Sequence, residues 1–223
     1  MVSTPMKRWK KMALPGDGAV VGAMSRTLRW ATMAILAAIS GWTGRAAVAT
    51  MPPPASRWEI DFTSGVLWKM GGGTPLAYTL LPQIISLKIP PISERPWHGG
   101  TLVYRTRLSL LLEPIVRGPE HFYTGVTASG ELEWRSRSQR FSGFFGGGGG
   151  FGVLDSRGYE IPGGQGQDFN LNWMLQAGAR FRTASDWWLT FGVYFQHISN
   201  RGMDKVNPGL NAIGPTFGIA RKY

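Results

Sequence analysis

The chain has 223 residues, with 31 glycines, 10 Trp, 6 Tyr, 11 Phe and no cysteine, and only 17% of its residues are charged. The length indicates one domain, the lack of cysteine excludes disulfides, thiol catalysis and Cys-ligated metal centres, and the glycine and aromatic content fits neither a disordered chain nor a coiled coil. The formal net charge is +11, but residues 1–49 hold seven Lys or Arg and one acid, so the excess is mostly N-terminal and does not indicate nucleic-acid binding.

The N-terminal segment has the parts of a secretory signal peptide. Two arginines follow Met24, residues 30–42 carry no charge, and a small-x-small motif ends at Ala49. The uncharged stretch is shorter than the roughly 20 residues that cross a bilayer as a helix, which favours a signal peptide over the alternative, an N-terminal membrane anchor. We therefore expect a start at Met24 and cleavage after Ala49, which makes residues 1–49 an N-terminal extension and signal peptide and residues 50–223 the folded domain.

From residue 57 onward, apolar and polar side chains alternate with the period of β-strands, and no long apolar run or helical period interrupts this pattern. In the clearest segment, 168–182, aromatic and aliphatic side chains alternate with Asn, Gln and Arg. Turn residues separate the alternating segments. The expected strands are 57–70, 76–89, 101–113, 122–137, 140–154, 168–182, 186–199 and 211–222.

An even number of strands closes into a barrel. The strands are long, their polar faces carry charges of both signs that pair inside a narrow lumen, and Trp, Tyr and Phe lie at strand ends as in an interfacial girdle. These features favour an all-β, eight-stranded antiparallel outer-membrane β-barrel over the alternative of a soluble β-sandwich. Side chains fill the lumen of such a barrel, so we expect no open pore and a function on the rim, the loops or the outer wall.

The strand expected at 186–199 ends on two polar side chains in an apolar row. Its odd positions run from Trp187 to Phe195 as a lipid-facing row that continues into His197 and Ser199. Polar groups that face lipid are costly and need a reason. Two positions apart on one face of a strand, a histidine and a serine lie within reach of each other as a base and a nucleophile require; the alternative is a pair of ordinary interfacial residues.

The residues that follow carry a resemblance. His-Ile-Ser-Asn-Arg-Gly at 197–202, followed by Asn-Pro-Gly at 207–209, resembles the signature of the PagL-type lipid A 3-O-deacylases, and Gln-Asp-Phe-Asn at 167–170 fits the same family. The similarity covers roughly residues 120–222. The first motif is short, and it gains specificity from its place on the penultimate strand of a cysteine-free barrel.

The resemblance implies an outer-membrane serine esterase that removes an ester-linked (3-O) acyl chain from the lipid A of lipopolysaccharide. It makes Ser199 the nucleophile and His197 the general base, with Asn200 and the backbone N–H of Gly202 as donors of the oxyanion hole. The implied partners are lipopolysaccharide and outer-membrane lipid, with no nucleic acid, no cofactor and no metal. Whether the barrel forms a homodimer is left open.

The sequence departs from the family at the third member of the triad. The family's acid lies 14 residues after the histidine, and here that position is Asn211, in a suitable phase on the last strand. The uncharged amide keeps a second interpretation open, a non-catalytic outer-membrane barrel with a structural or binding role and a decayed triad. Asp204, in the loop between the last two strands, is the alternative source of the missing charge.

Two other features do not indicate a site. The glycine run 146–150 lacks the Gly-Lys-Ser/Thr of a P-loop and opens no helix, so we expect these glycines to allow the close approach of backbone or ligand. His98 and His121 have no partners at ligand spacing, so we expect no metal site.

Overall fold

The computed structural model describes residues 58–184 and 186–223, so the predicted signal peptide and its cleavage site lie outside the described residues. The regular elements of the described part are β-strands, and no helix within it is long and apolar enough to cross a bilayer. The strands are β1 (Glu59–Gly65), β2 (Leu67–Lys69), β3 (Thr79–Leu80), β4 (Gln83–Lys88), β5 (Ser93–Trp97), β6 (Gly100–Arg117), β7 (Phe122–Ser136), β8 (Phe141–Leu154), β9 (Phe169–Arg182), β10 (Trp187–Ser199) and β11 (Leu210–Lys222).

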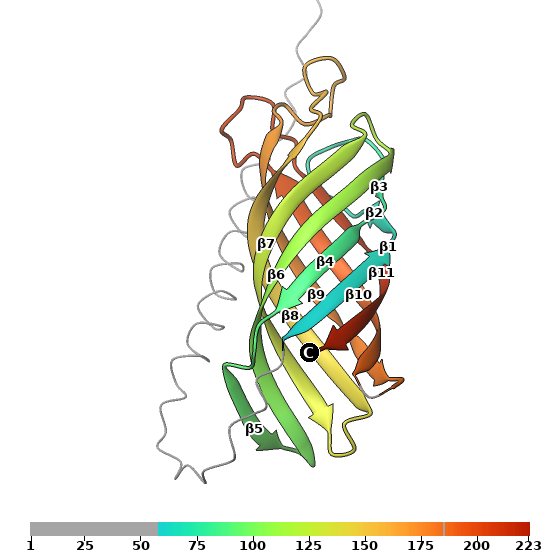
Figure 1. The fold of residues 1–223 in the computed structure, drawn as a ribbon. Helices are drawn as coiled ribbons and strands as arrows, with labels where there is room; N and C mark the ends of the chain where they lie inside the picture. The colour runs from blue at the N-terminus through green and yellow to red at the C-terminus, as the bar shows by residue number, and fades with distance from the viewer. Residues whose placement is uncertain (1–57, 185) are drawn as a thin grey trace, which may run out of the picture. The chain divides into compact units, whose positions relative to one another are not determined.

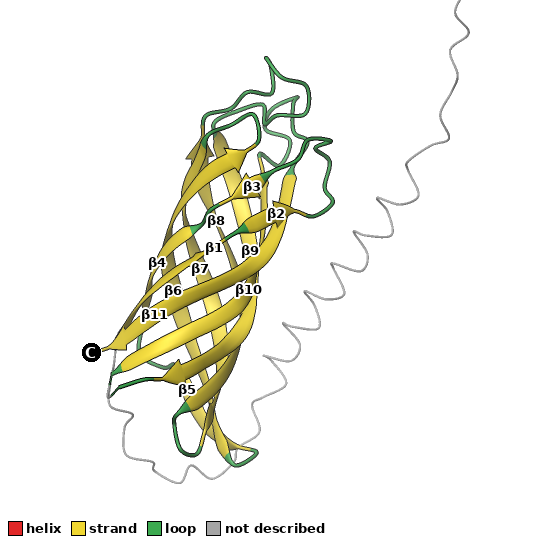
Figure 2. Ribbon diagram, turned by 90° about the vertical axis from the view of Figure 1, so that its right-hand side faces the viewer, coloured by secondary structure: helices red, strands yellow, loops and turns green. Residues whose placement is uncertain are grey.

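The strands close into one antiparallel barrel (Figures 1 and 2). Neighbours pair in sequence from β6 to β11, and β1 closes the circle because it pairs with both β11 and β4. β1 and β2 together occupy one position in the wall, as do β3 and β4. The expected eight-stranded antiparallel barrel is therefore confirmed.

Two of the expected strands, 57–70 and 76–89, are each divided into two shorter strands. The second breaks at Pro82, which has no N–H to donate to the ladder. The first breaks at Val66, which lies beside Pro215 of the neighbouring strand β11. The N–H of Val66 donates to the carbonyl of Pro215 at 3.3 Å. In both places a proline removes a ladder bond while the chain continues in the same direction.

The strand β5 is not among the strands expected from the sequence. Ile89 and Ile92 donate to the carbonyls of Thr106 and Tyr104 on β6, so the chain stays on β6 before and after two prolines at positions 90 and 91. β5 then continues along β6 and pairs with it in antiparallel register, with Ser93 opposite Tyr104. These prolines interrupt the alternation from which a strand is predicted, and only the pairing with β6 reveals the extension.

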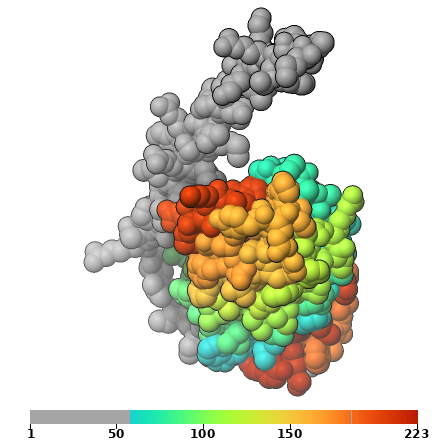
Figure 3. Space-filling model, turned by 90° about the horizontal axis from the view of Figure 1, so that it is seen from above, coloured from blue at the N-terminus to red at the C-terminus, as the bar shows by residue number. Residues whose placement is uncertain are grey.

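Side chains that point inward fill the lumen with ion pairs. Arg180 bonds both carboxylate oxygens of Glu131 at 2.9 Å, and Lys88 lies 3.0 Å from Glu59 and 3.3 Å from Glu131. All four side chains are at most 1% exposed. Buried charges persist only when they are paired, so the alternation of charge predicted on the inner face builds a packed interior. Seen from one end, the atoms of the described chain leave no open channel (Figure 3).

The glycine run in β8 serves backbone packing. A Cβ added at Gly148 would overlap the carbonyl oxygen of Ala128, and one at Gly150 would overlap that of Val126. Both carbonyls belong to β7, the neighbouring strand. These glycines therefore allow β7 to approach β8 closely. Of the two expected reasons for the glycine run, close approach of backbone or of a ligand, the first is confirmed.

Candidate active site

The two ends of the barrel differ in their connections (Figure 2). The longer loops, 70–78, 155–168 and 200–209, gather at one end, which we call the long-loop end. Short turns such as 98–99 and 137–140 lie at the other, the short-turn end. Outer-membrane barrels have short periplasmic turns and longer extracellular loops. The candidate site lies where β10 runs into the longer-loop region.

Strand pairing brings the three predicted triad positions together. His197 and Ser199 are two apart on β10, and the register of β10 with β11 sets His197 opposite Asn211. The Nε2 atom of His197 lies 2.9 Å from Oγ of Ser199, and its Nδ1 atom lies 2.6 Å from Oδ1 of Asn211. All three side chains are half-buried. One imidazole thus contacts both other positions at hydrogen-bond distance.

Asn211 determines which nitrogen of the imidazole carries the proton. The Oδ1 atom of an asparagine only accepts hydrogen bonds, so Nδ1 of His197 donates to it. The lone pair of Nε2 is then left to accept the proton of the Ser199 hydroxyl. Asn211 therefore supplies the tautomer that a general base needs, although it lacks the charge that would stabilise an imidazolium.

Two neighbours restrict the imidazole. Trp173 on β9 is opposite His197 in the register, and the two ring centres are 5.8 Å apart with planes inclined by 31°. Gly209 has a φ of 64°, and a Cβ there would come within 3.5 Å of Cε1 of His197. A side chain at this position would be strained by the backbone and would touch the imidazole.

The 70–78 loop braces the strand and loop that carry Asn211. Met70 donates its N–H to the carbonyl of Asn211 at 2.9 Å, and Thr74 donates to that of Gly209 at 3.3 Å. A Cβ at Gly72 would lie 3.4 Å from Nδ2 of Asn211. Residues more than 130 positions away in sequence therefore pack against the third triad position.

The two predicted oxyanion-hole residues lie beside Ser199, but their donors bond within the loop. Asn200 is fully buried, its Nδ2 donates to the carbonyl of Val206 at 3.0 Å, and its Oδ1 accepts from the N–H of Gly202 at 2.9 Å. The Gly202 N–H is thus engaged by Asn200 itself. In this arrangement Asn200 organises the loop, and an oxyanion role for either residue stays a prediction.

Asn207 is a residue that the sequence analysis treated only as part of a turn. Its Oδ1 accepts the backbone N–H of Asn200 at 3.0 Å, which holds its half-buried side chain against the residue that follows Ser199. With the oxygen so engaged, the carboxamide is oriented and its NH₂ group points away from this bond. The signal in the sequence that could have identified Asn207 as a site residue was the Asn-Pro-Gly motif. The first residue of this motif carries a hydrogen-bonding side chain that a turn alone does not need.

Asp204 does not reach His197. Its carboxylate accepts the hydroxyl of Tyr159 at 2.9 and 3.0 Å and the N–H of Val206 at 2.7 Å. The hydrogen bond to Asp204 raises the pKa of the Tyr159 phenol. The hypothesis that Asp204 supplies charge to His197 is therefore wrong in this structure, where the partner of Nδ1 is Asn211.

The closed barrel, its filled lumen and the hydrogen-bonded His–Ser pair on its outer wall define a class, the membrane barrels that have no open pore and carry polar side chains on the lipid-facing wall. The model of the lipid A 3-O-deacylase (PagL) family matches residues 90–220, and the chain belongs to this family. Family and fold together make it a β-barrel of the outer membrane.

Solved structures of outer-membrane barrels are similar to this chain. The crystal structure of the outer membrane enzyme PagL has 12% identity and a TM-score of 0.47, covering 72% of this chain and 97% of its own. That of Neisserial surface protein A has 11% identity and a TM-score of 0.44, covering 75% and 96%. A search of the curated proteins finds no match.

Proposed function

We propose that this protein is a serine esterase that removes the 3-O-linked acyl chain from lipid A, with Ser199 as nucleophile and His197 as general base. The observation that carries the proposal is the 2.9 Å contact between Oγ of Ser199 and Nε2 of His197, with Nδ1 held by Asn211 at 2.6 Å. The family match to lipid A 3-O-deacylases supports the substrate class.

The placement of the pair suits a substrate that lies in the membrane. His197 and Ser199 continue the outward row of β10, in which Phe191 and Val193 are 52% and 48% exposed on the outer wall. Polar side chains that face lipid in such a row cost free energy, so their presence there indicates a function. An acyl ester of lipid A in the outer leaflet reaches this wall without entering the barrel.

The reaction follows from the protonation states of the three groups. Oγ of Ser199 attacks the carbonyl carbon of the acyl ester while its proton passes to Nε2 of His197. Collapse of the tetrahedral intermediate breaks the bond to the 3-O oxygen of the sugar, which takes the proton from His197. Water then attacks the acyl-serine with His197 again as base, and the free fatty acid leaves.

The negative oxygen of the intermediate needs hydrogen-bond donors, each typically contributing about 2.7 to 4 kcal/mol. The carboxamide of Asn207 is the donor that we favour, because its oxygen accepts the N–H of Asn200, the residue after Ser199, and its NH₂ group is left to donate. Asn200 is buried and acts indirectly, through Asn207 and Gly202. Gly202 joins the oxyanion hole only if its N–H leaves Asn200.

Mass spectrometry of lipid A from cells that express the chain tests the proposal. We expect the loss of one hydroxyacyl chain with the intact protein, and no loss with Ser199→Ala or His197→Ala. Asn207→Ala should lower the yield of deacylated lipid A by about a hundredfold or more. Asn207→Asp keeps the size of the side chain and replaces its NH₂ donor by a charged oxygen, so comparison of the two variants separates the loss of the side chain from the change of its charge.

A second function has one observation in its favour, the uncharged Asn211 in place of a triad acid. On that alternative the barrel is a non-catalytic structural or binding protein of the outer membrane. The same experiment separates the two. A lipid A that stays intact with the folded wild-type chain, and is cleaved when Asn211 becomes Asp, would identify a barrel whose triad has decayed.

A further inference from the structure

The charged residues of the described chain fall into three groups by position. In the lumen and on the long-loop end, cations and acids balance. The lumen holds Lys88, Arg105, Arg107, Arg135 and Arg180 with Glu59, Asp61, Glu113, Glu131 and Glu133. The long-loop end holds Lys69, Arg117, Arg157, Arg201 and Lys205 with Glu120, Asp155, Glu160, Asp168 and Asp204.

The short-turn end is different. Five exposed arginines lie there with the half-buried Lys222, against two acids, Glu94 and Asp186. The whole net positive charge of the described barrel is therefore concentrated at the end opposite the candidate active site. We call the exposed arginines the arginine rim: Arg95, Arg137, Arg140, Arg182 and Arg221.

The arginine rim lies beside exposed aromatic side chains. Trp187 and Tyr223 are 40% and 58% exposed at this end, and the Arg221 guanidinium lies 5.3 and 5.0 Å from their ring centres. Exposed Trp97 and Phe141 flank the next two turns. Such girdles mark the level of the lipid head groups, so the guanidinium groups lie at the depth of the membrane interface.

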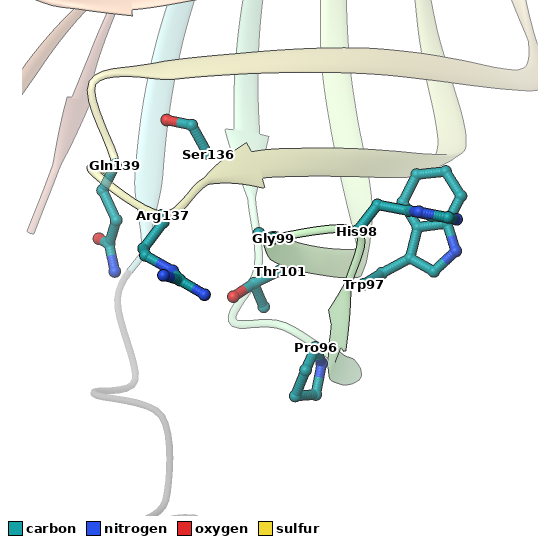
Figure 4. Close-up of a pocket in the computed structure, with 9 residues that line it drawn as sticks. Pro96, Trp97, His98, Gly99, Thr101, Ser136, Arg137 and Gln139 are labelled. Carbon is teal, nitrogen blue, oxygen red and sulfur yellow. The ribbon is translucent and has the colours of Figure 1, made fainter.

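A cavity of about 490 Å³ opens between the β5–β6 and β7–β8 turns of this end (Figure 4). Arg137 and Gln139 line it together with Thr101 and Ser136. In Figure 4 the Arg137 side chain extends toward Thr101. A guanidinium, an amide and the hydroxyl of Thr101 are hydrogen-bond donors that suit the oxygens of a phosphodiester.

We propose that the arginine rim binds the anionic head groups of phospholipids, in the leaflet opposite lipid A, and that the cavity at Arg137 receives one phosphodiester. Phosphatidylglycerol has this chemistry. A basic residue near an anionic lipid surface typically strengthens binding about fivefold, and the planar guanidinium group pairs with two phosphate oxygens at once. The balanced charges of the long-loop end give that end no comparable preference. The barrel is thereby held in register with the inner leaflet, independently of whether the active site is catalytic.

Native mass spectrometry of the full, folded protein in detergent micelles tests this binding. The probes are phosphatidylglycerol and phosphatidylcholine with identical acyl chains. We expect the wild-type chain to retain phosphatidylglycerol at least tenfold better, and the triple variant R137Q/R140Q/R221Q to lose the preference. The matched control, R117Q/R201Q/K205Q, removes three exposed cations from the long-loop end and should keep it.

Three results would overturn the proposal: equal retention of the two lipids by the wild-type chain, a preference that survives the triple variant, or an equal loss in the control. Displacement of phosphatidylglycerol by inorganic phosphate, at an ionic strength where chloride has no effect, would identify a site for free phosphate instead. If the glutamine variant does not fold, R137K/R140K/R221K keeps the charge and removes only the planar fork. It should retain a preference that is weaker than that of the wild type.

Discussion

The hydroxyl of Tyr159 donates to the carboxylate of Asp204, at 2.9 Å from Oδ2, and this bond joins the β8–β9 loop to the β10–β11 loop. It is the first step of a connected set of hydrogen bonds. Asp204 accepts from the N–H of Val206, the carbonyl of Val206 accepts from Asn200, and Asn200 accepts from the N–H of Gly202. A residue far from the reacting atoms is thus linked to the loop that follows Ser199.

Tyr159→Phe should therefore lower turnover without preventing folding. The phenol is 70% exposed, so its loss creates no buried cavity, while the loop loses a hydrogen bond of about 1 kcal/mol. We expect kcat for deacylation of lipid A in mixed micelles to fall about fivefold, with KM nearly unchanged. Asp204→Asn, which keeps an acceptor for Tyr159, should fall less than Asp204→Ala. Equal kcat in the wild type and Tyr159→Phe would show that the loop is held without this bond.

A negative charge at position 211 should raise activity. Oδ1 of Asn211 is already 2.6 Å from Nδ1 of His197, so Asp, which has the same shape, places a carboxylate oxygen at the same point. A hydrogen bond to a charged group contributes about 1.5 to 3 kcal/mol, which corresponds to about a 10- to 100-fold gain in kcat. Asn211→Leu, of similar size and without an acceptor, should abolish turnover. A fall in kcat with Asn211→Asp would mean that the neutral amide is the form this site requires.

The sequence predicted the barrel wall because a membrane-spanning strand has a different solvent on each face. The alternation in segments such as 101–113 follows directly from lipid on one side and paired charges on the other. The break at Val66 and the extension of β5 depend on which residues stand opposite, which the pattern within one strand does not contain. The break at Pro82 follows from a proline within the strand itself. At the site, alternation along one strand predicts that His197 and Ser199 share a face. Asn211 was expected only from the family resemblance, and its place opposite His197 comes from the register between β10 and β11.

Positions in the loops were harder to predict for a physical reason. The donors of Asn200 and Gly202 bond to partners that only the folded loop brings near, and the acid of Asp204 is taken by a tyrosine 45 residues away. A motif gives the residues of a loop and not their hydrogen-bond partners. The charge separation between the two ends of the barrel was likewise present in the sequence, but it becomes visible only when topology assigns each turn to an end.

Removal of one buried lumen charge should be far more costly than removal of an exposed one. Glu131 accepts two bonds from Arg180 and lies 3.3 Å from Lys88, with all three side chains at most 1% exposed. Glu131→Ala leaves three buried cations, Lys88, Arg107 and Arg180, without this partner and should lower the free energy of unfolding by about 3 to 5 kcal/mol. Glu160→Ala, whose side chain is 67% exposed in its pair with Arg157, should cost less than about 1 kcal/mol. Urea unfolding in micelles, followed by tryptophan fluorescence, measures both.

The β8–β9 loop should open at acid pH. Hydrogen bonds from the hydroxyl and N–H of Ser156 hold the pKa of Asp168 below its ordinary value. A lowered pKa means that this contribution is complete above the ordinary value, about 3.9, and is lost as the pH falls through the lower one. The protection factor of the Ser156 N–H, which compares its exchange rate with the intrinsic rate at the same pH, should therefore fall below about pH 4. Asp168→Asn keeps the acceptor and does not titrate, so an equal fall in this variant would assign the change to another group.

Gly209 should be needed for turnover more than for stability. At a φ of 64°, alanine costs about 1 to 2 kcal/mol, and its methyl group would lie 3.5 Å from Cε1 of His197 and 3.8 Å from Cβ of Ser199. Gly99 is the matched control, since it has a φ of 71° with nothing within 4 Å of an added Cβ. Both alanine variants should lose similar stability in urea, because the backbone strain is similar. Only Gly209→Ala should also lose kcat, by about tenfold, since its strain is relieved by movement beside the reacting atoms. If the two variants lose activity to the same extent, the imidazole tolerates that movement and the glycine is required by the turn alone.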